Sequence, residues 1–432
     1  MIDFENKSVA LIGFGISNRG MCEYLTKRGI YPTVRAHTPC RLPQGVTGVF
    51  GQDCLLTEED IVIRSPVIRP DRIRAKGIVT SELEISLEGC SGFKIGVTGS
   101  DGKTTVSTLI YRMLISGGKN AFLGGNIGRA LINISPMVSK SDFVVAEVSS
   151  FQLMDYCPCL DVGVLTGITP NHLDWHRDMA EYTGAKGNIL KNAKRQVVCY
   201  DNETARELAG ENSTLFSLTD LSRLVGRGHT LVYVRDGWVY YDYEALFPVS
   251  HICLRGQFNV QNVLCAVGAV YPLVGKDGCY RVAREFCGVE ERQEHVDTIN
   301  GVSFISSSID TTPSRTIATL SALDLRRTVV ILGGYDKNLS YGELGRVLSD
   351  AKALVLCGEN REKIEKSTQN PKIIGANTLG EAVRIAYGLC AEGDTVILSP
   401  ASASFDMFKN YKERGRCFKQ SVKELKEENR RS

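Results

Sequence analysis

The chain has 432 residues, of which 43% are hydrophobic and 23% charged, and this predicts a globular protein of two or three domains. Its 51 Lys and Arg residues nearly balance its 49 Asp and Glu residues, giving a net charge of +2. This balance argues against a bulk basic surface for nucleic acid, so any anion binding must come from local sites.

The first of three blocks of alternating strands and helices covers residues 1–91. A predicted strand over 8–12 leads through the turn Gly13-Phe-Gly15-Ile16-Ser17-Asn18 into a helix that ends near residue 27. Such a turn suits a phosphate or pyrophosphate group. A dehydrogenase is disfavoured, however, because Asn18 replaces the third glycine and the next strand, 32–35, lacks the acidic residue that binds the ribose of NAD.

The second block, residues 92–288, opens on the segment Gly96-Val-Thr-Gly99-Ser-Asp-Gly102-Lys103-Thr104-Thr105. The segment lies between a predicted strand, 93–97, and a predicted helix, 106–115. This order aims backbone N–H groups at the phosphates of a nucleotide. Lys103 would reach the β- and γ-phosphates and Thr104 would hold Mg²⁺, as in a P-loop, although Gly96 lies one residue earlier than the usual pattern requires.

Two further apolar strands of this block, 143–148 and 162–168, lead into polar residues. Burying the carboxylate of Glu147 at the end of the first strand would be costly without a cation, and Mg²⁺ is the obvious partner. His172 and Asp174 follow the second strand, at the edge where open α/β sheets bind their ligands. The segment 231–241 is predicted to be a hairpin that turns at Asp236-Gly237.

The third block, residues 289–432, repeats the pattern with strands over 328–332, 353–357 and 395–398, each followed by an amphipathic segment. This alternation predicts an α/β protein with parallel, right-handed, doubly wound sheets. The charge-dense residues 423–432 are predicted to be a frayed, solvated helix end.

We expect a cytoplasmic protein that binds no membrane, because residues 1–6 lack the pattern of a signal peptide and no run of 18 apolar residues occurs. We also expect a monomer. The fourteen cysteines show no paired framework and are expected to be reduced thiols of the core.

A set of short motifs spread over nearly the whole chain resembles those of the Mur ligases, and especially the branch that adds D-glutamate. In chain order the motifs are Thr98–Thr105, Gly124-Gly125-Asn126-Ile127-Gly128, Glu147-Val-Ser-Ser-Phe-Gln152, Asn171-His172-Leu173-Asp174, Ala185-Lys186, Asn259-x-x-Asn262, Arg292, Gly333-Gly334-x-x-Lys337 and Leu398–Asn410. The early position of Gly96 is this family's own form of the P-loop.

The resemblance implies a three-domain Mur ligase architecture. A Rossmann-like N-terminal domain, 1–91, would bind the UDP end of the substrate, a central P-loop ATPase domain, 92–288, would bind ATP, and a Rossmann-like C-terminal domain, 289–432, would bring the amino acid. The implied enzyme is an ATP-dependent ligase of peptidoglycan precursor synthesis. It would phosphorylate the carboxylate of UDP-N-acetylmuramoyl-L-alanine, and the amine of D-glutamate would attack the acyl phosphate. ATP and two Mg²⁺ ions, or Mn²⁺, would be the cofactors, since the phosphate charge must be neutralised during in-line transfer.

The resemblance also implies roles for individual residues. The catalytic residues would be Lys103, His172, Lys186 and Arg292. The metal ligands would be Thr104, Glu147, His172 and Lys186 carbamylated on its amine. ATP would contact Gly99, Gly102, Lys103, Thr104, Thr105, Asn259, Asn262 and Arg292. The UDP substrate would contact Gly15, Ile16, Ser17, Asn126 and Gln152. D-Glutamate would contact Thr311, Lys337, Ser404, Phe405 and Tyr411. Without the resemblance, Lys186 has the pattern of a solvated helix lysine and Lys337 that of a loop lysine.

The chain departs from the family pattern around the expected nucleotide site. Phe258 and Glu291 stand where the family has histidine. The run 306–308 reads Ser-Ser-Ser instead of Asn-Asp-Ser, so Ser307 replaces the aspartate expected at the ATP ribose, and Asp310 is the candidate substitute. Losing a charged hydrogen bond of this kind costs ~1.5–3 kcal/mol.

Two hypotheses therefore stay open. The first is an active D-glutamate-adding ligase with altered ATP contacts. The second is a diverged paralogue that binds nucleotide or UDP-sugar without turnover, or that ligates another amino acid. The intact set Lys103, Glu147, His172 and Lys186 favours turnover.

Overall fold

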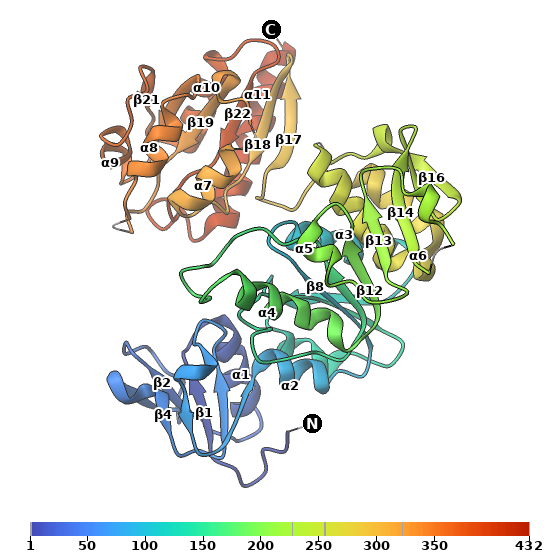
Figure 1. Cartoon of the computed structure of the whole chain (residues 1–432). Helices are drawn as coiled ribbons and strands as arrows, with labels where there is room; N and C mark the ends of the chain where they lie inside the picture. Colours follow the sequence, from blue (N-terminus) through green and yellow to red (C-terminus); the bar gives the residue numbers. More distant parts are fainter. Residues whose placement is uncertain (1, 227, 255, 322, 338, 432) are drawn as a thin grey trace. The chain divides into compact units, whose positions relative to one another are not determined.

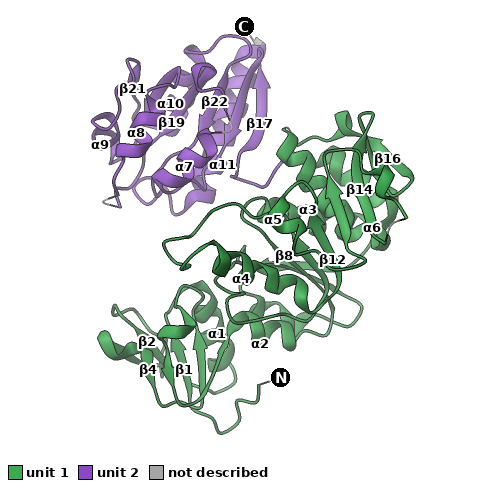
Figure 2. Cartoon of the chain, viewed as in Figure 1, with its two compact units in different colours: residues 1–286 green, residues 287–432 purple. Residues whose placement is uncertain are grey.

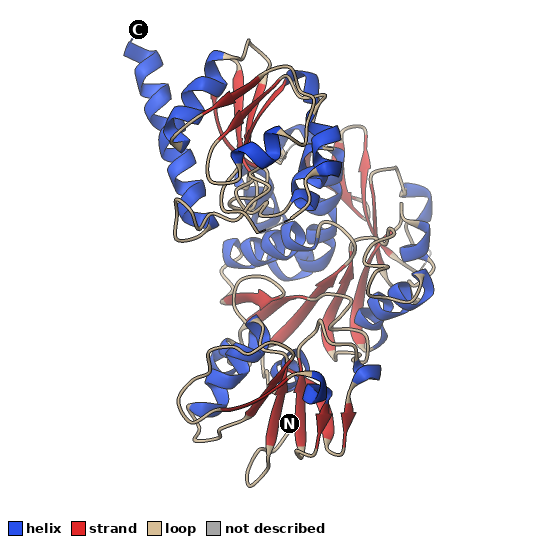
Figure 3. Ribbon diagram, turned by 90° about the vertical axis from the view of Figure 1, so that its left-hand side faces the viewer, coloured by secondary structure: helices blue, strands red, loops and turns tan. Residues whose placement is uncertain are grey.

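The computed structural model describes residues 2–431, except for residues 227, 255, 322 and 338. The chain divides into two compact units, residues 1–286 and 287–432 (Figure 2). Strands and helices alternate along most of the chain, and the helices pack on the faces of the sheets (Figures 1 and 3). The predicted α/β class is therefore confirmed.

The first sheet of unit 1 is parallel and has the strand order β3-β2-β1-β5-β7. Alternate residues of its central strand face opposite sides, with Val9 and Leu11 in one core cluster and Ala10 and Ile12 in another. The strands are β1 (Val9–Ile12), β2 (Thr33–Ala36), β3 (Thr47–Phe50), β5 (Ile61–Arg64) and β7 (Ile78–Ser81), with helices α1 (Ile16–Thr26) and α2 (Glu82–Glu88). Strands β4 (Leu56–Thr57) and β6 (Arg74–Ala75) form a separate pair.

The second sheet of unit 1 has nine strands in the order β16-β15-β14-β13-β12-β11-β8-β10-β9. Strands β8 to β14 run parallel, and β15 and β16 extend the sheet antiparallel. The predicted hairpin turn is confirmed, because Asp236 and Gly237 both have positive φ between β14 and β15. The strands are β8 (Phe93–Thr98), β9 (Ala121–Gly125), β10 (Phe143–Glu147), β11 (Leu160–Leu165), β12 (Ala193–Cys199), β13 (Thr214–Ser217), β14 (Thr230–Arg235), β15 (Trp238–Tyr241) and β16 (Glu244–Pro248). The helices are α3 (Lys103–Ser116), α4 (Met179–Lys191), α5 (Glu203–Arg206) and α6 (Gln257–Glu285).

Helix α6 is kinked near its middle, at Pro272 and Gly275. Pro272 has no N–H to bond the carbonyl of Gly268, and Arg195 from β12 donates to that carbonyl (3.1 Å) and to the carbonyl of Ala269 instead. By length and composition α6 could cross a membrane, but half of its apolar window is buried and it packs on α3 and β13. We therefore assign α6 as a core helix of unit 1.

The sheet of unit 2 has the order β17-β18-β22-β19-β20-β21 and is parallel except for β17. Alternate residues of β19 enter two cores, with Val329 and Ile331 on the side of α10 and α11 and Val330 and Leu332 on the side of α8. The strands are β17 (Glu294–Ile299), β18 (Val302–Ser306), β19 (Thr328–Leu332), β20 (Ala353–Leu356), β21 (Ile373–Gly375) and β22 (Thr395–Leu398). The helices are α7 (Pro313–Leu320), α8 (Gly342–Leu348), α9 (Arg361–Glu365), α10 (Leu379–Gly388) and α11 (Tyr411–Arg431).

Two expectations from the sequence are wrong in part. The charge-dense end of the chain is a mostly exposed helix end, as predicted, but up to residue 431 it continues α11 and is not frayed, with Leu425 in the core and Lys426 bonded to Asp297 (2.6 Å). Residue 432 lies outside the described residues. Twelve cysteines are free in the described chain, but Cys253 and Cys287 are each disulfide-bonded, which their spacing in the sequence does not reveal. The predicted domain boundaries at 91/92 and 288/289 stay predictions.

Candidate active site

The candidate site lies at the carboxyl edge of the nine-stranded sheet, where β8, β10 and β11 are neighbours. The loop Gly99–Gly102 joins β8 to α3, as the sequence predicts. Gly99 and Gly102 have φ of +151° and +77°, and an added Cβ would lie 1.8 Å from Thr166 Oγ1 and 2.3 Å from Asn262 Oδ1, respectively. Both the conformation and the close approach therefore require glycine at these two positions.

At Gly96, close packing of side chains requires glycine, and the backbone conformation does not. It lies inside β8, where an added Cβ would lie 2.6 Å from Leu160 Cδ1 and 2.9 Å from Ile189 Cδ1. This glycine thus lets β11 and α4 pack closely on β8. Thr104 and Thr105 lie in the first turn of α3, and Thr104 is buried.

Two lysines converge on the carbonyl groups of the loop. Lys103 Nζ donates to the carbonyls of Gly99 and Ser100, both at 2.8 Å, and Lys186 Nζ donates to the same Gly99 carbonyl at 2.6 Å. Lys186 comes from α4 and is only 1% exposed. Burial, together with the nearby charge of Lys103, lowers the pKa of Lys186 to about 6. The prediction of a solvated helix lysine is therefore wrong, and the amine is mostly neutral at pH 7.

Glu147 ends β10 and is buried beside this loop edge. Its Oε1 accepts a hydrogen bond from Asn126 Nδ2 (3.0 Å), and its buried Oε2 has no hydrogen-bond partner among the described residues. A buried carboxylate oxygen left in this state fits a ligand for a cation. The described chain contains no group of three or more His, Cys, Asp or Glu side chains that could hold a metal, so other donors must complete a site here.

His172 follows β11 with an unusual positive φ of 55°, and its ring lies 5.0 Å from that of Phe151. Burial lowers the pKa of His172, and the charges of Lys103 and Lys186 lower it further. The influence of both lysines places His172 near the loop, as the resemblance implies. The neutral imidazole is the form that can bind a metal.

Asn259 and Asn262 lie in the first turns of α6, and Asn262 Nδ2 donates to Asn259 Oδ1 (3.2 Å). Asn262 lines a cavity of about 260 Å³ beside the glycine loop. Its other lining residues are Ser100, Asp101, Gly102, Thr166, Gly167, Thr169, Cys199, Asp201, Asn202, Phe258 and Gln261. A neighbouring cavity of about 650 Å³ shares Asp201 and Gln261. Asp201 and Asn202 were not predicted from the sequence, although polar residues shortly after the apolar end of β12, Val197-Val198-Cys199, were a usable signal.

The residues expected at the UDP substrate lie on both sheets of unit 1. Gly15 is the N-cap of α1, and Ile16 and Ser17 begin that helix, so the turn follows β1 of the first sheet. Asn126 follows β9 of the nine-stranded sheet. Gln152 follows β10 and is buried, where its Oε1 accepts from the backbone N–H of Ser149 (2.9 Å).

The residues expected at D-glutamate follow three neighbouring parallel strands of unit 2. Thr311 follows β18, Lys337 follows β19, and Ser404 follows β22. Lys337 Nζ lies 3.5 Å from the Thr311 carbonyl, which brings these two residues together. Ser404 is buried, whereas the Phe405 side chain is 66% exposed and Tyr411 begins α11. Arg292 lies in the turn before β17 and belongs to unit 2, so its pairing with the P-loop of unit 1 stays a prediction.

The departures from the family pattern in unit 2 are buried and internally bonded. Glu291 is 2% exposed and accepts from Ser306 Oγ (2.5 Å) and Lys419 Nζ (3.0 Å). Ser307 is fully buried, and Asp310 is held by Ser399 Oγ (2.8 Å). Phe258, in contrast, is 52% exposed at the start of α6 in unit 1.

Comparison with known proteins agrees with this arrangement. Residues 97–270 match the family model described as the Mur ligase middle domain, and residues 291–402 match the Mur ligase, glutamate ligase domain. The chain is 39% identical to UDP-N-acetylmuramoylalanine–D-glutamate ligase of Acetivibrio thermocellus, covering 98% of this chain and 97% of the relative. The protein of the same name from Ruminiclostridium cellulolyticum is 36% identical, with 98% of each chain covered.

Solved structures show the same fold. The UDP-N-acetylmuramate-alanine ligase of Thermotoga maritima matches with a TM-score of 0.57 at 17% identity, over 98% of this chain and all of the other. A pseudomurein peptide ligase type C from Methanothermus fervidus gives a TM-score of 0.54 at 16% identity over the same shares. The motifs, the fold and these full-length relatives agree, and the chain belongs to the Mur ligase family.

Proposed function

We propose that the protein is an ATP-dependent ligase that adds D-glutamate to UDP-N-acetylmuramoyl-L-alanine in peptidoglycan precursor synthesis. One observation carries the proposal: a P-loop lysine, a buried carboxylate oxygen without a partner in the described chain, and a desolvated lysine meet at one sheet edge. A protein that merely bound a nucleotide with its Mg²⁺ could use the first two, but it would gain nothing from the desolvated lysine. The names of the relatives support the choice of substrates.

The residues at this edge fit two Mg²⁺ ions, with Mn²⁺ as an alternative. Thr104 and Glu147 would hold one ion, and His172 with carbamylated Lys186 would hold the other. Bound Mg²⁺ would neutralise the phosphate charge during transfer of the phosphoryl group. Lys186 is suited to carbamylation because its neutral nitrogen can attack the carbon of CO₂ and release a proton. The product is a carbamate, which would offer an anionic oxygen to the metal ion in place of the uncharged amine.

The remaining roles follow from the same assignment. Lys103 would neutralise the γ-phosphoryl group as it moves to the substrate carboxylate, and Gly99 and Gly102 would offer backbone N–H groups to the phosphates, beside Thr105. Asn259 and Asn262 would meet the adenine, and Arg292 the phosphates. Gly15, Ile16, Ser17, Asn126 and Gln152 would bind the UDP substrate. Thr311, Lys337, Ser404, Phe405 and Tyr411 would bind D-glutamate.

A phosphate-release assay with ATP, UDP-N-acetylmuramoyl-L-alanine and a panel of D- and L-amino acids tests the proposal. We expect phosphate release that depends on D-glutamate. Release with a different amino acid, or none with any, would contradict it. We also propose a cytoplasmic monomer, which light scattering on the purified protein and fractionation of cells would check.

A further inference from the structure

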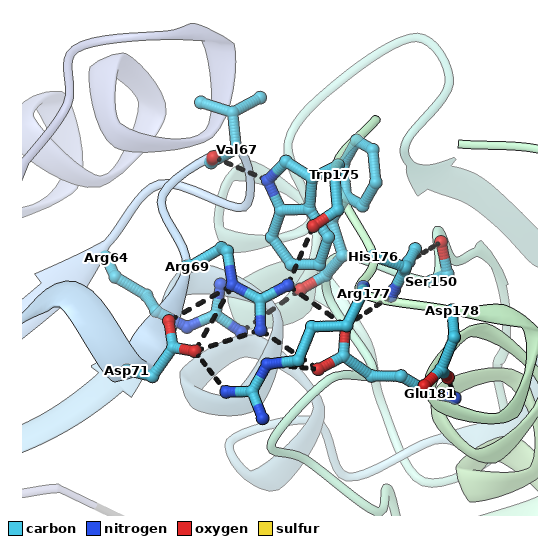
Figure 4. Close-up of polar contacts among 11 residues, drawn as sticks. Arg64, Val67, Arg69, Asp71, Ser150, Trp175, His176, Arg177, Asp178 and Glu181 are labelled. Carbon is cyan, nitrogen blue, oxygen red and sulfur yellow. Dashed lines mark hydrogen bonds and ion pairs between the residues drawn. The ribbon is translucent and has the colours of Figure 1, made fainter. Parts of the chain in front are cut away.

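A cluster of polar contacts joins the loop after β5 of the first sheet to the beginning of α4 (Figure 4). Its centre is Arg69, which is 8% exposed. Arg69 donates through Nη1 to the Trp175 carbonyl (2.7 Å) and through Nη1 and Nη2 to both carboxylate oxygens of Glu181 (3.0 and 2.9 Å). Its Nε and Nη2 donate to Asp71 (3.1 and 2.9 Å). All five N–H groups of the guanidinium are therefore engaged, in a geometry that lysine cannot reproduce.

Glu181 extends these contacts, through His176, to Ser150 in the motif Glu147–Gln152. Its carboxylate lies 3.5 Å from His176 Nδ1, and the Nε2 of this buried histidine lies 2.9 Å from Ser150 Oγ (Figure 4). Arg64, at the end of β5, donates to the neighbouring Phe151 carbonyl (3.1 Å). Arg64 thus contacts the segment directly after β10, and Arg69 reaches it through Glu181 and His176.

A second set of contacts leads from His176, just before α4, through Tyr182 in the first turn of α4 to the P-loop. His176 packs against the ring of Tyr182, with the ring centroids 5.1 Å apart. The Tyr182 hydroxyl lies 2.9 Å from Ser100 Oγ, and Lys186 Nζ lies 4.7 Å from the centroid of the Tyr182 ring. Arg69 is therefore connected to Lys186 through Glu181, His176 and Tyr182.

We propose that Arg69 is a positioning residue for the catalytic edge: by fixing the first turn of α4 it holds Lys186 in the geometry that accepts CO₂ and keeps Tyr182 against the P-loop. This inference rests on the proposed function for the role of Lys186. Arg69 does not need to contact the substrate for this role. The loop 65–71 follows the strand beside the Gly13–Ser17 turn, where an added Cβ on Gly13 would lie 2.8 Å from Ser65 Cβ. The loop therefore connects the expected UDP site with α4.

The test compares Arg69→Lys, Arg69→Ala and Glu181→Gln with Arg72→Ala, which removes an exposed arginine directly after this loop. Carbamate on the intact protein is measured by ¹³C NMR with ¹³C-bicarbonate and without substrates, and Lys186→Ala identifies its signal. We expect the wild type and Arg72→Ala to show the signal. In Arg69→Lys and Glu181→Gln it should fall by at least half at equal bicarbonate, and kcat should fall about 10- to 100-fold with the KM for the UDP substrate within about threefold.

Melting temperatures distinguish a positioning role of Arg69 in catalysis from a role in stability alone. Lower melting temperatures with unchanged carbamate and kcat would overturn the proposal, as would the absence of a Lys186-dependent signal in the wild type. If Arg69→Ala does not fold, Arg69→Lys and Glu181→Gln decide, because they keep most of the side-chain volume. A wild type that forms carbamate but does not use D-glutamate would contradict the proposed function alone, and the NMR comparison would still decide on Arg69.

Discussion

Two buried polar regions of this protein have opposite characters. At the edge of the nine-stranded sheet, Glu147 Oε2 has no partner among the described residues, and the Lys186 amine is desolvated beside a second lysine. In the segment 291–310 of unit 2, Glu291 is paired with Lys419 and Ser306, and Asp310 is bonded to Ser399. Buried polar atoms are normally satisfied within the fold. A buried polar atom without a hydrogen-bond partner in the described fold therefore indicates a ligand site. A buried polar group that is bonded within the fold indicates a structural role.

The largest effect should come from Lys103→Ala at the unsatisfied edge. The lysine would neutralise the transferring phosphoryl group, so we expect kcat to fall by about 10³-fold, on the order reported for loss of a transition-state contact. We expect the diphosphate of the UDP precursor at the Gly13–Ser17 turn of the first sheet, so calorimetry should show an affinity for the precursor within about threefold of the wild type. The control is Lys140→Ala, an exposed lysine in the turn before β10. Loss of precursor binding in Lys103→Ala would mean that the loop holds a different ligand.

Lys186→Ala should lower kcat by about 10²-fold, since one oxygen ligand of the metal site would be missing. Added acetate should restore part of the activity by supplying that oxygen. Lys191→Ala, at the exposed end of the same helix, should behave as the wild type. Undiminished activity in Lys186→Ala would refute the role of this lysine.

The lowered pKa of Lys186 also predicts how the free energy of unfolding depends on pH. Its pKa is lowered to about 6 by burial, from 10.5 in the unfolded chain, so unfolding takes up a proton between these values. The free energy of unfolding should therefore rise with pH across this window. Lys186→Met, measured by urea unfolding in CO₂-free buffer, should be more stable than the wild type at pH 7 and less dependent on pH. Equal slopes in the two proteins would show that the amine is not desolvated.

At the satisfied region, Glu291→Ala should affect stability rather than catalysis. It would remove the acceptor of buried Ser306 and one of two carboxylates beside Lys419, at a cost of about 1–3 kcal/mol. An added Cβ on Gly415 would lie 1.7 Å from Glu291 Oε2, so the glycine and the glutamate fit each other. We expect the KM for ATP to stay within about twofold. A tenfold rise would show that Glu291 faces the nucleotide.

Sequence patterns predicted several strands near the two regions, but neither β17 and β18 of the second region nor the buried contacts inside either. The bounds of β19 and β22 agree with the structure, because a threonine followed by three or four consecutive apolar residues fits a strand buried on both faces. The sheet-edge rule likewise placed Glu147 and His172 beside the P-loop. The burial of Lys186 and the pairing of Glu291 with Lys419 could not be predicted from the residues alone, since they depend on contacts between segments far apart in the chain. The Arg69–Glu181 contact was missed for the same reason.

The smallest effect is expected at Ser307, and it decides whether this region reads the nucleotide. If Ser307 were an uncompensated loss of the ribose aspartate, Ser307→Asp would tighten ATP binding about tenfold or more. If Asp310 compensated, Asp310→Ala would weaken it. The structure favours a third outcome, because Ser307 is fully buried and Asp310 is only 4% exposed.

Burial already raises the pKa of Asp310, despite its hydrogen bonds from Ser307, Thr319 and Ser399. A second carboxylate from Ser307→Asp would be placed against it, which should lower the melting temperature without adding a contact to ATP. We therefore expect Ser307→Asp and Asp310→Ala to change the KM for ATP by less than about twofold, with Ser307→Ala as the neutral control. A tenfold tightening in Ser307→Asp would show that this loop opens toward the ribose, and the distinction between satisfied and unsatisfied regions would then fail at this position.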